Sequence, residues 1–310
     1  MRILVDKYIP FLQGVLDRSA EISFLEPEQF TPENVRAAEA LIIRTRTRCD
    51  AALLDGSRVR FIATATIGTD HIDFEYCRAH DIHVASCPGC NAQAVCDYVE
   101  EAVRTFAIGH GRHPDDYSIG IVGVGHVGSK VEKMALGHHM QVVLNDPPRG
   151  INGDVTACDI ITFHTPLIQN GDYPTWHLCN KSFLARCKPD ALIINAARGG
   201  VVDEQALLEG TQPFVLDTWE NEPDISHEVL CRAWLASMHI AGYSVQGKRN
   251  ASQMCLDALC DYFRLPARPI VLDNEVRQGD CAEGWLRRIS DCLKAQPDNF
   301  ESMRKNYKLR

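Results

Sequence analysis

The sequence lacks any apolar run approaching the roughly 20 residues that a membrane-spanning helix needs. At its start, MRILVDKYIP enters a strand-like segment at once, without the long apolar core and small-residue cleavage site of a signal peptide. Positive charge is in the minority, with 32 Lys and Arg against 41 Asp and Glu and a net charge of −9. That balance argues against a sequence-independent nucleic-acid surface. We therefore expect a cytoplasmic protein that binds neither membrane nor nucleic acid.

The cysteines lack the regular spacing of a disulfide framework. There are 13 of them, an odd number, and most stand alone along the 310 residues. A chain of this length buries enough apolar surface to fold without disulfides. We expect reduced thiols that fill the core as small apolar side chains.

The run Cys87-Pro88-Gly89-Cys90 is the exception, because a CxxC is typical of redox disulfides and of zinc sites. No second CxxC and no nearby pair of histidines supplies the remaining zinc ligands, so we expect no metal. The alternative is an ordinary turn, in which Gly89 provides backbone freedom and Asn91 caps the following helix. A thiol oxidoreductase using Cys87 and Cys90 is the rival interpretation.

Short apolar runs alternate with stretches of helical length. This alternation predicts βαβ units and parallel sheets, and therefore an α/β fold. The expected strands are Ile3–Val5, Ala40–Ile43, Phe61–Ala63, Ser118–Val122, Gln141–Leu144, Ile160–His164, Ala191–Asn195 and Phe214–Asp217.

Two long helical patterns divide the chain into lobes. Residues 94–111 have apolar side chains at three- and four-residue spacing, and residues 250–263 show a second such pattern that could return the chain to the first lobe. We expect one lobe from residues 1–93 plus 246–265, a second lobe from residues 94–245, and a short C-terminal tail over residues 266–310.

The stretch SIGIVGVGHVGSKVEKMAL contains Gly123-x-Gly125-x-x-Gly128 between an apolar strand and a helical pattern. In that context the glycines allow a tight turn, a close approach of pyrophosphate and helix–strand packing. Asp146 ends the next strand, where a carboxylate binds ribose hydroxyls and repels a 2′-phosphate, so NAD is favoured over NADP. Arg149 weakens that preference. The alternative is a Rossmann-like domain whose glycine turn binds nothing.

Three polar residues follow at expected strand ends: Arg198 in INAARGG, Glu222 in TWENEP and His239 in MHIAGY. Arginine clamps carboxylates through two parallel hydrogen bonds, and histidine exchanges protons near neutral pH with a carboxylate on its far nitrogen. Beside a nicotinamide, such a set suffices to oxidise a 2-hydroxy acid. Each residue also has a structural alternative: Arg198 pairing with Asp203, and His239 as a satisfied core histidine.

The motifs GIVGVGHVG, FHTPL, INAARGGVVDEQAL, LDTWENEP and HIAGY together resemble the D-isomer-specific 2-hydroxyacid dehydrogenases. The resemblance implies a flavodoxin-like substrate lobe and a Rossmann NAD lobe with open parallel sheets, and an active site between them. It implies Arg198, Glu222 and His239 as catalytic residues and Thr45, Thr66 and Tyr243 as substrate contacts. The implied cofactor contacts are Gly123, Gly125, His126, Val127, Gly128, Asp146, Thr165, Ala196, Ala197, Arg198, Asp217 and Gly242.

More specific motifs, among them IIRTRT, TATIGTDHID and SCPGCNAQAVCDYV, resemble the branch of this family that oxidises 4-phospho-D-erythronate at C2. A small phosphorylated hydroxy acid is therefore the expected substrate. Arg44, Arg46 and Arg48 would share one side of an extended segment, so some of them would meet its phosphate, or they form a solvated basic edge. The rivals are a dehydrogenase of another 2-hydroxy acid, such as 3-phosphoglycerate, and a non-enzymatic NAD sensor.

The tail is shorter than the C-terminal dimerisation domain that the family usually carries, since 45 residues follow Leu265. Trp285, Leu286, Ile289 and Leu293 form one apolar stripe at helical spacing, which is too little for an independent domain. The stripe is expected to lie either on the chain's own substrate lobe or on a partner subunit. Closed two-fold dimers are the commonest soluble assemblies, so a homodimer is favoured.

Overall fold

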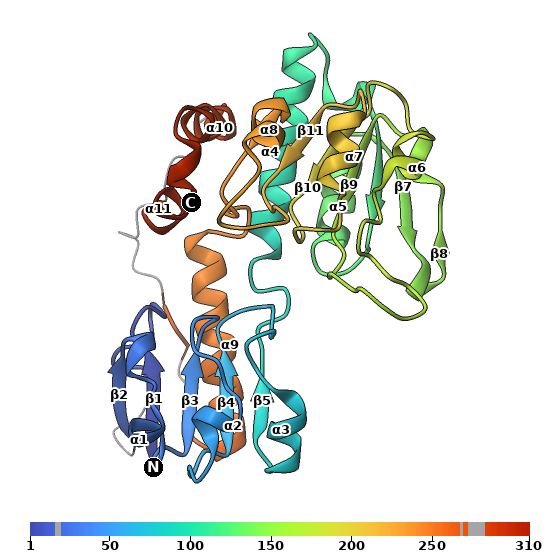
Figure 1. Ribbon diagram of the computed structural model, residues 1–310. Coiled ribbons are helices and arrows are strands. Elements are labelled where there is room, and N and C mark those ends of the chain that lie inside the picture. Colours follow the sequence, from blue (N-terminus) through green and yellow to red (C-terminus); the bar gives the residue numbers. More distant parts are fainter. Residues whose placement is uncertain (16–19, 267–268, 272–282) are drawn as a thin grey trace. The chain divides into compact units, whose positions relative to one another are not determined.

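The computed structural model describes residues 1–15, 20–266, 269–271 and 283–310. These residues form two compact units (Figure 1). Unit 1 contains the described residues of Met1–Asn91 and Ser244–Arg277, and unit 2 those of Ala92–Tyr243 and Gln278–Arg310. Each unit has its own parallel sheet, which confirms the predicted α/β fold. Which unit binds substrate and which binds NAD remains a prediction.

Unit 1 is a five-stranded parallel sheet in the order β2-β1-β3-β4-β5. Its middle strands are buried on both faces, which explains the uninterrupted apolar runs ALII and FIAT. Side chains alternate between the faces: Ile42 packs in the cluster that contains Leu256 of α9, whereas Leu41 packs in the cluster that contains Leu53 of α2. The elements are β1 (Arg2–Asp6), β2 (Glu21–Leu25), α1 (Pro32–Val35), β3 (Ala40–Ile43), α2 (Ala51–Leu54), β4 (Phe61–Thr64), α3 (Phe74–Ala79), β5 (His83–Ala85) and α9 (Val245–Phe263).

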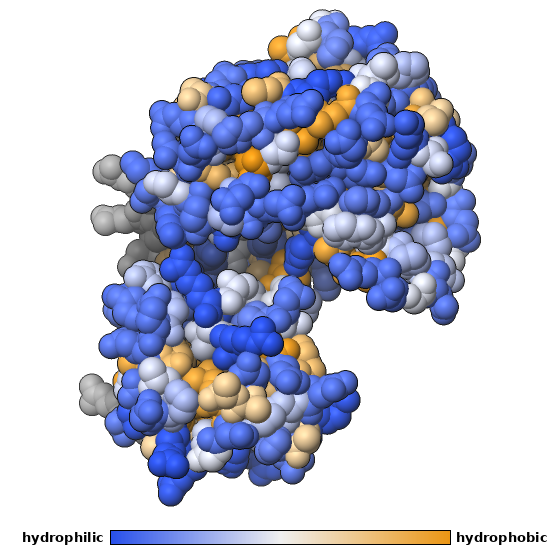
Figure 2. All heavy atoms as spheres, viewed as in Figure 1, coloured by the Kyte–Doolittle hydropathy of each residue, from blue (hydrophilic) through white to orange (hydrophobic). Residues whose placement is uncertain are grey.

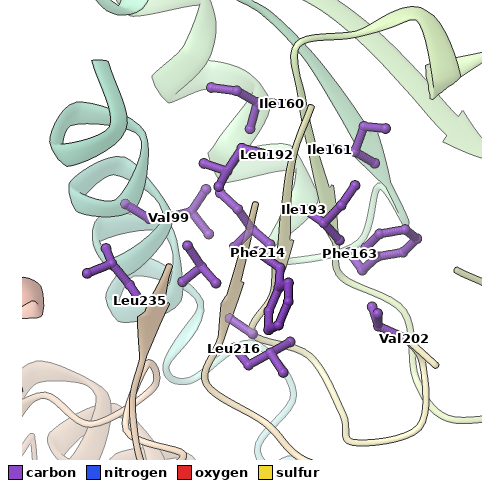
Figure 3. Packing of buried hydrophobic residues seen from close by; sticks show 14 of the residues in the cluster. Val99, Ile160, Ile161, Phe163, Leu192, Ile193, Val202, Phe214, Leu216 and Leu235 are labelled. Atoms are coloured by element: carbon purple, nitrogen blue, oxygen red, sulfur yellow. The ribbon is translucent and has the colours of Figure 1, made fainter. Parts of the chain in front are cut away.

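Unit 2 is a seven-stranded sheet in the order β12-β11-β10-β9-β6-β7-β8, parallel except for β8. Val99 of α4 and Leu192, Phe214 and Leu235 of the sheet meet in its core (Figure 3). The elements are α4 (Ala92–Gly109), β6 (Ser118–Val122), α5 (Gly128–Gly137), β7 (Gln141–Asp146), β8 (Ile151–Asn152), β9 (Ile160–Phe163), α6 (Lys181–Leu184), β10 (Leu192–Asn195), α7 (Glu204–Glu209), β11 (Phe214–Leu216), α8 (His227–Arg232), β12 (Leu235–Ala236), α10 (Trp285–Ala295) and α11 (Phe300–Lys305). Five 3-10 turns complete the two units: η1 (Pro27–Gln29), η2 (Pro114–Asp116), η3 (Pro147–Arg149), η4 (Val155–Ala157) and η5 (Pro297–Asn299).

All eight expected strands are present, but α9 begins before the predicted helix. The Ser244 side chain accepts a hydrogen bond from the Gly247 backbone at 2.9 Å and caps α9 there. The polar first turns of α9 carry no apolar periodicity, which is why the pattern starts only at residue 250. The expected cap at the start of α4 is wrong: within the described residues the Asn91 Oδ1 atom is buried without a hydrogen-bond partner.

The CxxC forms a turn in which Gly89 has φ +74°. The Cys87 thiol donates to the carbonyls of Thr64 and Ala251, each at 3.3 Å, and lies 3.5 Å from the Cys255 sulfur. Burial raises the pKa of Cys90 to about 11, and a protonated thiol is a poor nucleophile and metal ligand. Both thiols are buried in this turn, and the absence of a redox or zinc role stays a prediction.

The tail packs on unit 2, a surface that was not among the two predicted alternatives. Helix α10 packs against β12 and α4 of unit 2, so the expectation of a contact with the substrate lobe or a partner is wrong. Trp285, Leu286 and Leu293 are buried in the unit 2 core, and Phe300 of α11 joins them. The tail is therefore part of the hydrophobic core of unit 2.

On the face drawn in Figure 2, hydrophilic side chains cover most of the described surface and hydrophobic ones occur in small groups. Along the described ranges of the chain, each helix is too short or too polar to cross a membrane.

Candidate active site

The candidate site follows the carboxyl ends of the strands in unit 2 (Figure 1). Ligands of open α/β sheets bind at this edge, where the strand order reverses. Here the reversal lies at β6, which pairs with β7 on one side and with β9 on the other. The predicted cofactor and catalytic residues of unit 2 follow six strand ends: Gly123–Gly128 after β6, Asp146 at the end of β7, Thr165 after β9, Ala196–Arg198 after β10, Asp217 and Glu222 after β11, and His239 and Gly242 after β12.

The turn after β6 requires glycine at two of its three positions. Gly123 has φ +88°, and a Cβ atom there would lie 2.8 Å from the His164 carbonyl oxygen. A Cβ atom at Gly128 would clash with the Gly123 carbonyl, so α5 can begin close to the strand only with glycine there. At Gly125 the space is open except for Arg149 at 3.7 Å. The first and third glycines shape the turn, and the second leaves its backbone accessible to a phosphate.

Asp146 is tied to this turn. Its Oδ2 atom accepts a hydrogen bond from the Val124 backbone at 2.8 Å and lies 3.5 Å from the Arg149 guanidinium. The same guanidinium donates to the Val124 carbonyl. The Arg149 guanidinium therefore offsets part of the negative charge of Asp146 that a 2′-phosphate would meet. This effect weakens the predicted preference for NAD over NADP.

A pocket of about 490 Å³ adjoins the turn, within the usual size range of ligand sites. Its walls include Pro147, Ile168 and Tyr173. Two polar atoms in its lining, Nδ1 of His164 and Oγ1 of Thr165, are buried without a partner among the described residues. Burial lowers the pKa of His164 to about 3, so its imidazole is neutral at physiological pH. Because buried polar atoms normally have partners, these two suit a ligand such as a dinucleotide.

His239 and Glu222 form a hydrogen-bonded pair, with His239 Nδ1 donating to Glu222 Oε2 at 2.7 Å. The other Glu222 oxygen accepts from the Trp219 backbone at 2.9 Å. The His239 side chain keeps 39% of its surface exposed, and its backbone has φ +57°, a conformation that occurs at functional sites at an energetic cost.

Burial alone would lower the pKa of His239, but the hydrogen bond and charge of Glu222, helped by Asp217, outweigh it and raise the pKa. Pairing with Glu222 therefore favours the protonated form of His239 more than in an isolated histidine. Because Glu222 engages Nδ1, Nε2 is left available for a proton exchange with a ligand.

Asp217 anchors the His239 loop. Its Oδ1 atom accepts hydrogen bonds from the Ile240 backbone and the Ser237 hydroxyl, both at 2.7 Å, and its Oδ2 atom accepts from the Ala241 backbone at 2.9 Å. This buried carboxylate holds the left-handed backbone at His239. Its predicted cofactor contact remains untested, and no sequence signal indicated the anchoring role.

Arg198 is presented by a turn that Asn195 stabilises. The Asn195 side chain accepts from the Ala197 backbone at 3.1 Å and donates to the Arg198 carbonyl at 2.9 Å. Asp203, the structural partner considered for Arg198, instead caps α7 and lies 3.6 Å from His177. Arg198 contributes one guanidinium hydrogen bond, to the Ala197 carbonyl.

Comparison with known proteins decides the family. The model of the D-isomer specific 2-hydroxyacid dehydrogenase catalytic domain matches residues 6–271. The chain belongs to the D-isomer-specific 2-hydroxyacid dehydrogenases. It is 42% identical to a protein of Bacteroides fragilis named erythronate-4-phosphate dehydrogenase, over 100% of this chain and 97% of that one.

Two solved structures share the fold. The TT0316 protein of Thermus thermophilus has a TM-score of 0.71 and 26% identity, over 88% of this chain and 100% of that one. The NAD-bound 3-phosphoglycerate dehydrogenase of Entamoeba histolytica has a TM-score of 0.69 and 23% identity, over 88% and 99%. Membership of this family makes the chain an enzyme of the dehydrogenase class.

Of the substrate contacts predicted from the dehydrogenase family, Thr45 and Thr66 follow β3 and β4, adjacent strands of unit 1. Thr45 is exposed, and the Thr66 hydroxyl shares a hydrogen bond with Thr64 at 2.6 Å and donates to the Gly68 carbonyl. The third predicted contact, Tyr243, lies in unit 2 after β12, with its ring 6.3 Å from that of Tyr307.

The prediction that Arg44, Arg46 and Arg48 lie on an extended segment is wrong. Residues 44–47 form a turn, closed by a hydrogen bond from the Thr47 backbone to the Arg44 carbonyl. The Arg44 guanidinium pairs with buried Asp6 at 3.1 Å, and that of Arg48 pairs with Asp50 at 2.7 Å. Alternation along a strand therefore does not decide which of these side chains meets a phosphate.

A further cluster, which the sequence did not predict, lies near Glu222 in this dehydrogenase. One ligand atom each from His177, Asp203 and Glu220 lies within 4.8 Å of the others, a spacing that a metal ion could bridge. His177 already donates to Glu220 at 3.1 Å, and Glu220 and Glu204 accept each other's backbone N–H groups. Burial and the neighbouring carboxylates raise the pKa of Glu204 to about 7. These contacts describe an internal hydrogen-bond network, and the expectation of no metal stays a prediction.

Proposed function

We propose that this enzyme oxidises 4-phospho-D-erythronate at C2 with NAD, giving 2-oxo-3-hydroxy-4-phosphobutanoate, a step in pyridoxal 5′-phosphate biosynthesis. The observation that carries the proposal is the His239–Glu222 pair on the same sheet edge as the glycine turn. The name of the Bacteroides fragilis relative, 42% identical along the whole chain, supports the choice of substrate.

The residues present fit a dinucleotide. The turn at Gly123–Gly128 would hold the pyrophosphate, Asp146 the ribose, and the pocket with its unpartnered His164 and Thr165 atoms the adenosine. NAD, when bound, accepts the hydride from C2. The further contacts proposed for it are His126, Val127, Ala196, Ala197, Arg198, Asp217 and Gly242.

His239 removes the C2 hydroxyl proton through Nε2 while Glu222 stabilises the imidazolium that forms. Arg198 binds the substrate carboxylate and the C2 oxygen, and so orients the C–H bond. Thr45, Thr66 and Tyr243 are the proposed substrate contacts. The oxidation balances because C2 loses one hydride and its hydroxyl oxygen loses one proton to His239, which leaves a C2 carbonyl.

The test is NAD reduction with 4-phospho-D-erythronate beside 3-phospho-D-glycerate and D-lactate. We expect the highest kcat/KM with 4-phospho-D-erythronate, because the relatives that match along the whole chain carry that name. A preference for 3-phospho-D-glycerate would identify another dehydrogenase of the family. Tight NAD binding without turnover of any hydroxy acid would identify a sensor.

Asp146→Ala is expected to weaken NAD binding by roughly 10- to 100-fold, because a hydrogen bond to a charged group contributes about 1.5–3 kcal/mol. Discrimination against NADP should relax at the same time. Asp146→Asn is the matched control: it keeps an acceptor for the Val124 backbone and loses only the charge. Dissociation constants for NAD and NADP check both variants, and equal affinities in the wild type would show the assignment of Asp146 to be wrong.

We also propose a cytoplasmic homodimer, whose ligands are small molecules and include neither nucleic acid nor membrane. The acidic net charge of −9 and the frequency of two-fold dimers support this proposal. Mass measurement in solution tests the assembly, and a monomer at micromolar concentration would refute it.

A further inference from the structure

The C-terminal segment lies beyond the family match at residues 6–271, yet it is attached on both sides of His239. The Ser290 hydroxyl of α10 accepts a hydrogen bond from the Ala236 backbone at 3.0 Å. The Arg310 guanidinium donates to the Ala241 carbonyl at 2.7 Å and stacks over Trp285, 4.3 Å from its ring centre. Tail residues therefore hold both the strand that precedes the catalytic histidine and the loop that follows it.

Between these two attachments, α11 places Arg304 beside the catalytic pair. The Arg304 Nη1 atom lies 3.5 Å from Glu222 Oε2, the oxygen that accepts the hydrogen bond from His239. Arg304 also hydrogen-bonds the Tyr243 side chain. Its side chain is 31% exposed, so its charge acts through a partly desolvated medium in which electrostatic interactions are stronger than in water.

We propose that Arg304 is a positioning residue of the dehydrogenase reaction: it holds the shared oxygen of the Glu222–His239 pair and offsets the carboxylate charge that acts on His239. The proposal rests on the proposed function, because it assigns His239 as the base. It gives the tail a part in catalysis in addition to its part in the core.

The charges around His239 set the direction of the effect. Burial lowers the pKa of His239, Glu222 and Asp217 raise it, and Arg304 lowers it. His239 must be neutral to accept the hydroxyl proton, so a cation beside Glu222 keeps the base available at lower pH. Among the described residues, the other titratable groups that interact with the pair or with Arg304 include Asp217, Glu204, Glu301 and Tyr243.

The test is the pH profile of kcat/KM for Arg304→Gln. Without the guanidinium the acidic limb should move up by about one pH unit, a shift within reach of one nearby charge. At a pH below the limb, kcat/KM would fall by about 10-fold, with a much smaller change on the plateau. Arg304→Lys keeps the charge and should retain the wild-type limb.

Lys305→Gln is the matched control, because it removes the same charge from the same helix at a side chain that pairs with Glu301 at 3.6 Å. Its profile should equal that of the wild type. If the acidic limb of the kcat/KM profile has the same pH midpoint in Arg304→Gln as in the wild type, the proposal is overturned. A higher KM for the phosphorylated substrate with an unchanged pH midpoint would also overturn it, since Arg304 would then bind substrate directly.

A second measurement separates this proposal from the choice of substrate. NMR titration of the histidine-labelled protein, with the His239 signal assigned from His239→Gln, reports the pKa of His239 without turnover. We expect a higher pKa in Arg304→Gln and a wild-type pKa in Lys305→Gln and Arg304→Lys. An unchanged pKa in folded Arg304→Gln refutes the proposal even if the substrate is correct, and a raised pKa supports it even if 4-phospho-D-erythronate is not turned over.

Discussion

Replacing His239 with alanine is expected to lower kcat/KM by at least about 100-fold, since general acid–base catalysis typically contributes 10²- to 10⁴-fold. The expected loss follows from the proposed mechanism: Glu222 engages Nδ1 and leaves Nε2 to take the hydroxyl proton. Arg198→Ala should cost at least as much, because without its guanidinium the carboxylate and C2 oxygen lose their orientation. Steady-state kinetics across pH measure both.

The chain offers a matched control for His239. His138 donates to Glu100 at 2.7 Å, the same distance as in the catalytic pair, with 33% and 35% of the two side chains exposed. This pair joins α4 to the residue that caps the C-terminal end of α5, whereas the carboxyl edge of the sheet faces the start of α5. His138→Ala should leave kcat/KM unchanged. A comparable loss in both variants would show that a His–Glu pair matters here for folding and not for proton transfer.

Glu222→Gln should cost less than His239→Ala and should shift the pH profile. Glu222 raises the pKa of His239 in the folded enzyme, so the charge-neutral variant lowers that pKa. The acidic limb of kcat/KM would then move to lower pH, opposite to the shift expected for Arg304→Gln. An unmoved limb would remove Glu222 from the proton-transfer step.

Deleting the described tail, residues 283–310, is expected to prevent unit 2 from folding stably. Trp285, Leu286, Leu293 and Phe300 are almost fully buried, and each such side chain contributes about 2 kcal/mol. Their sum, on the order of 8 kcal/mol, is comparable with the whole stability of a typical domain. We therefore expect the deletion variant to lose the fold around His239 and Glu222 as well, which circular dichroism and NAD reduction would measure together.

A single substitution tests the same point without removing a segment. Leu286 has no exposed surface, and Leu286→Ala should lower the free energy of unfolding by about 2–5 kcal/mol. Leu136→Ala on α5 is the control, because that side chain is 55% exposed and its loss should cost less than about 0.5 kcal/mol. Urea unfolding curves measure both, and equal midpoints for the two variants would place α10 outside the core.

Local pattern was enough to predict the α/β fold and the strand ends that the candidate site residues follow. The strand Ala40–Ile43 was predicted with its bounds, because a four-residue apolar run that is buried on both faces has no other simple interpretation. The glycine turn and Asp146 were predicted because strand, turn and helix are contiguous in the chain. Strands β5, β8 and β12 were missed because they have only three, two and two residues, and β2 was missed because its five residues are only partly buried or exposed.

By itself, the sequence determined the α/β class, the glycine turn, and the polar residues at the strand ends, because each depends on neighbours within a few positions. The tertiary structure alone decided which distant groups meet. Asp217 holds the His239 loop and Arg304 reaches Glu222 across 82 positions. A contact over such a separation depends on the packing of α10 on α4 and β12, and helical periodicity predicts an apolar stripe without predicting the surface that covers it.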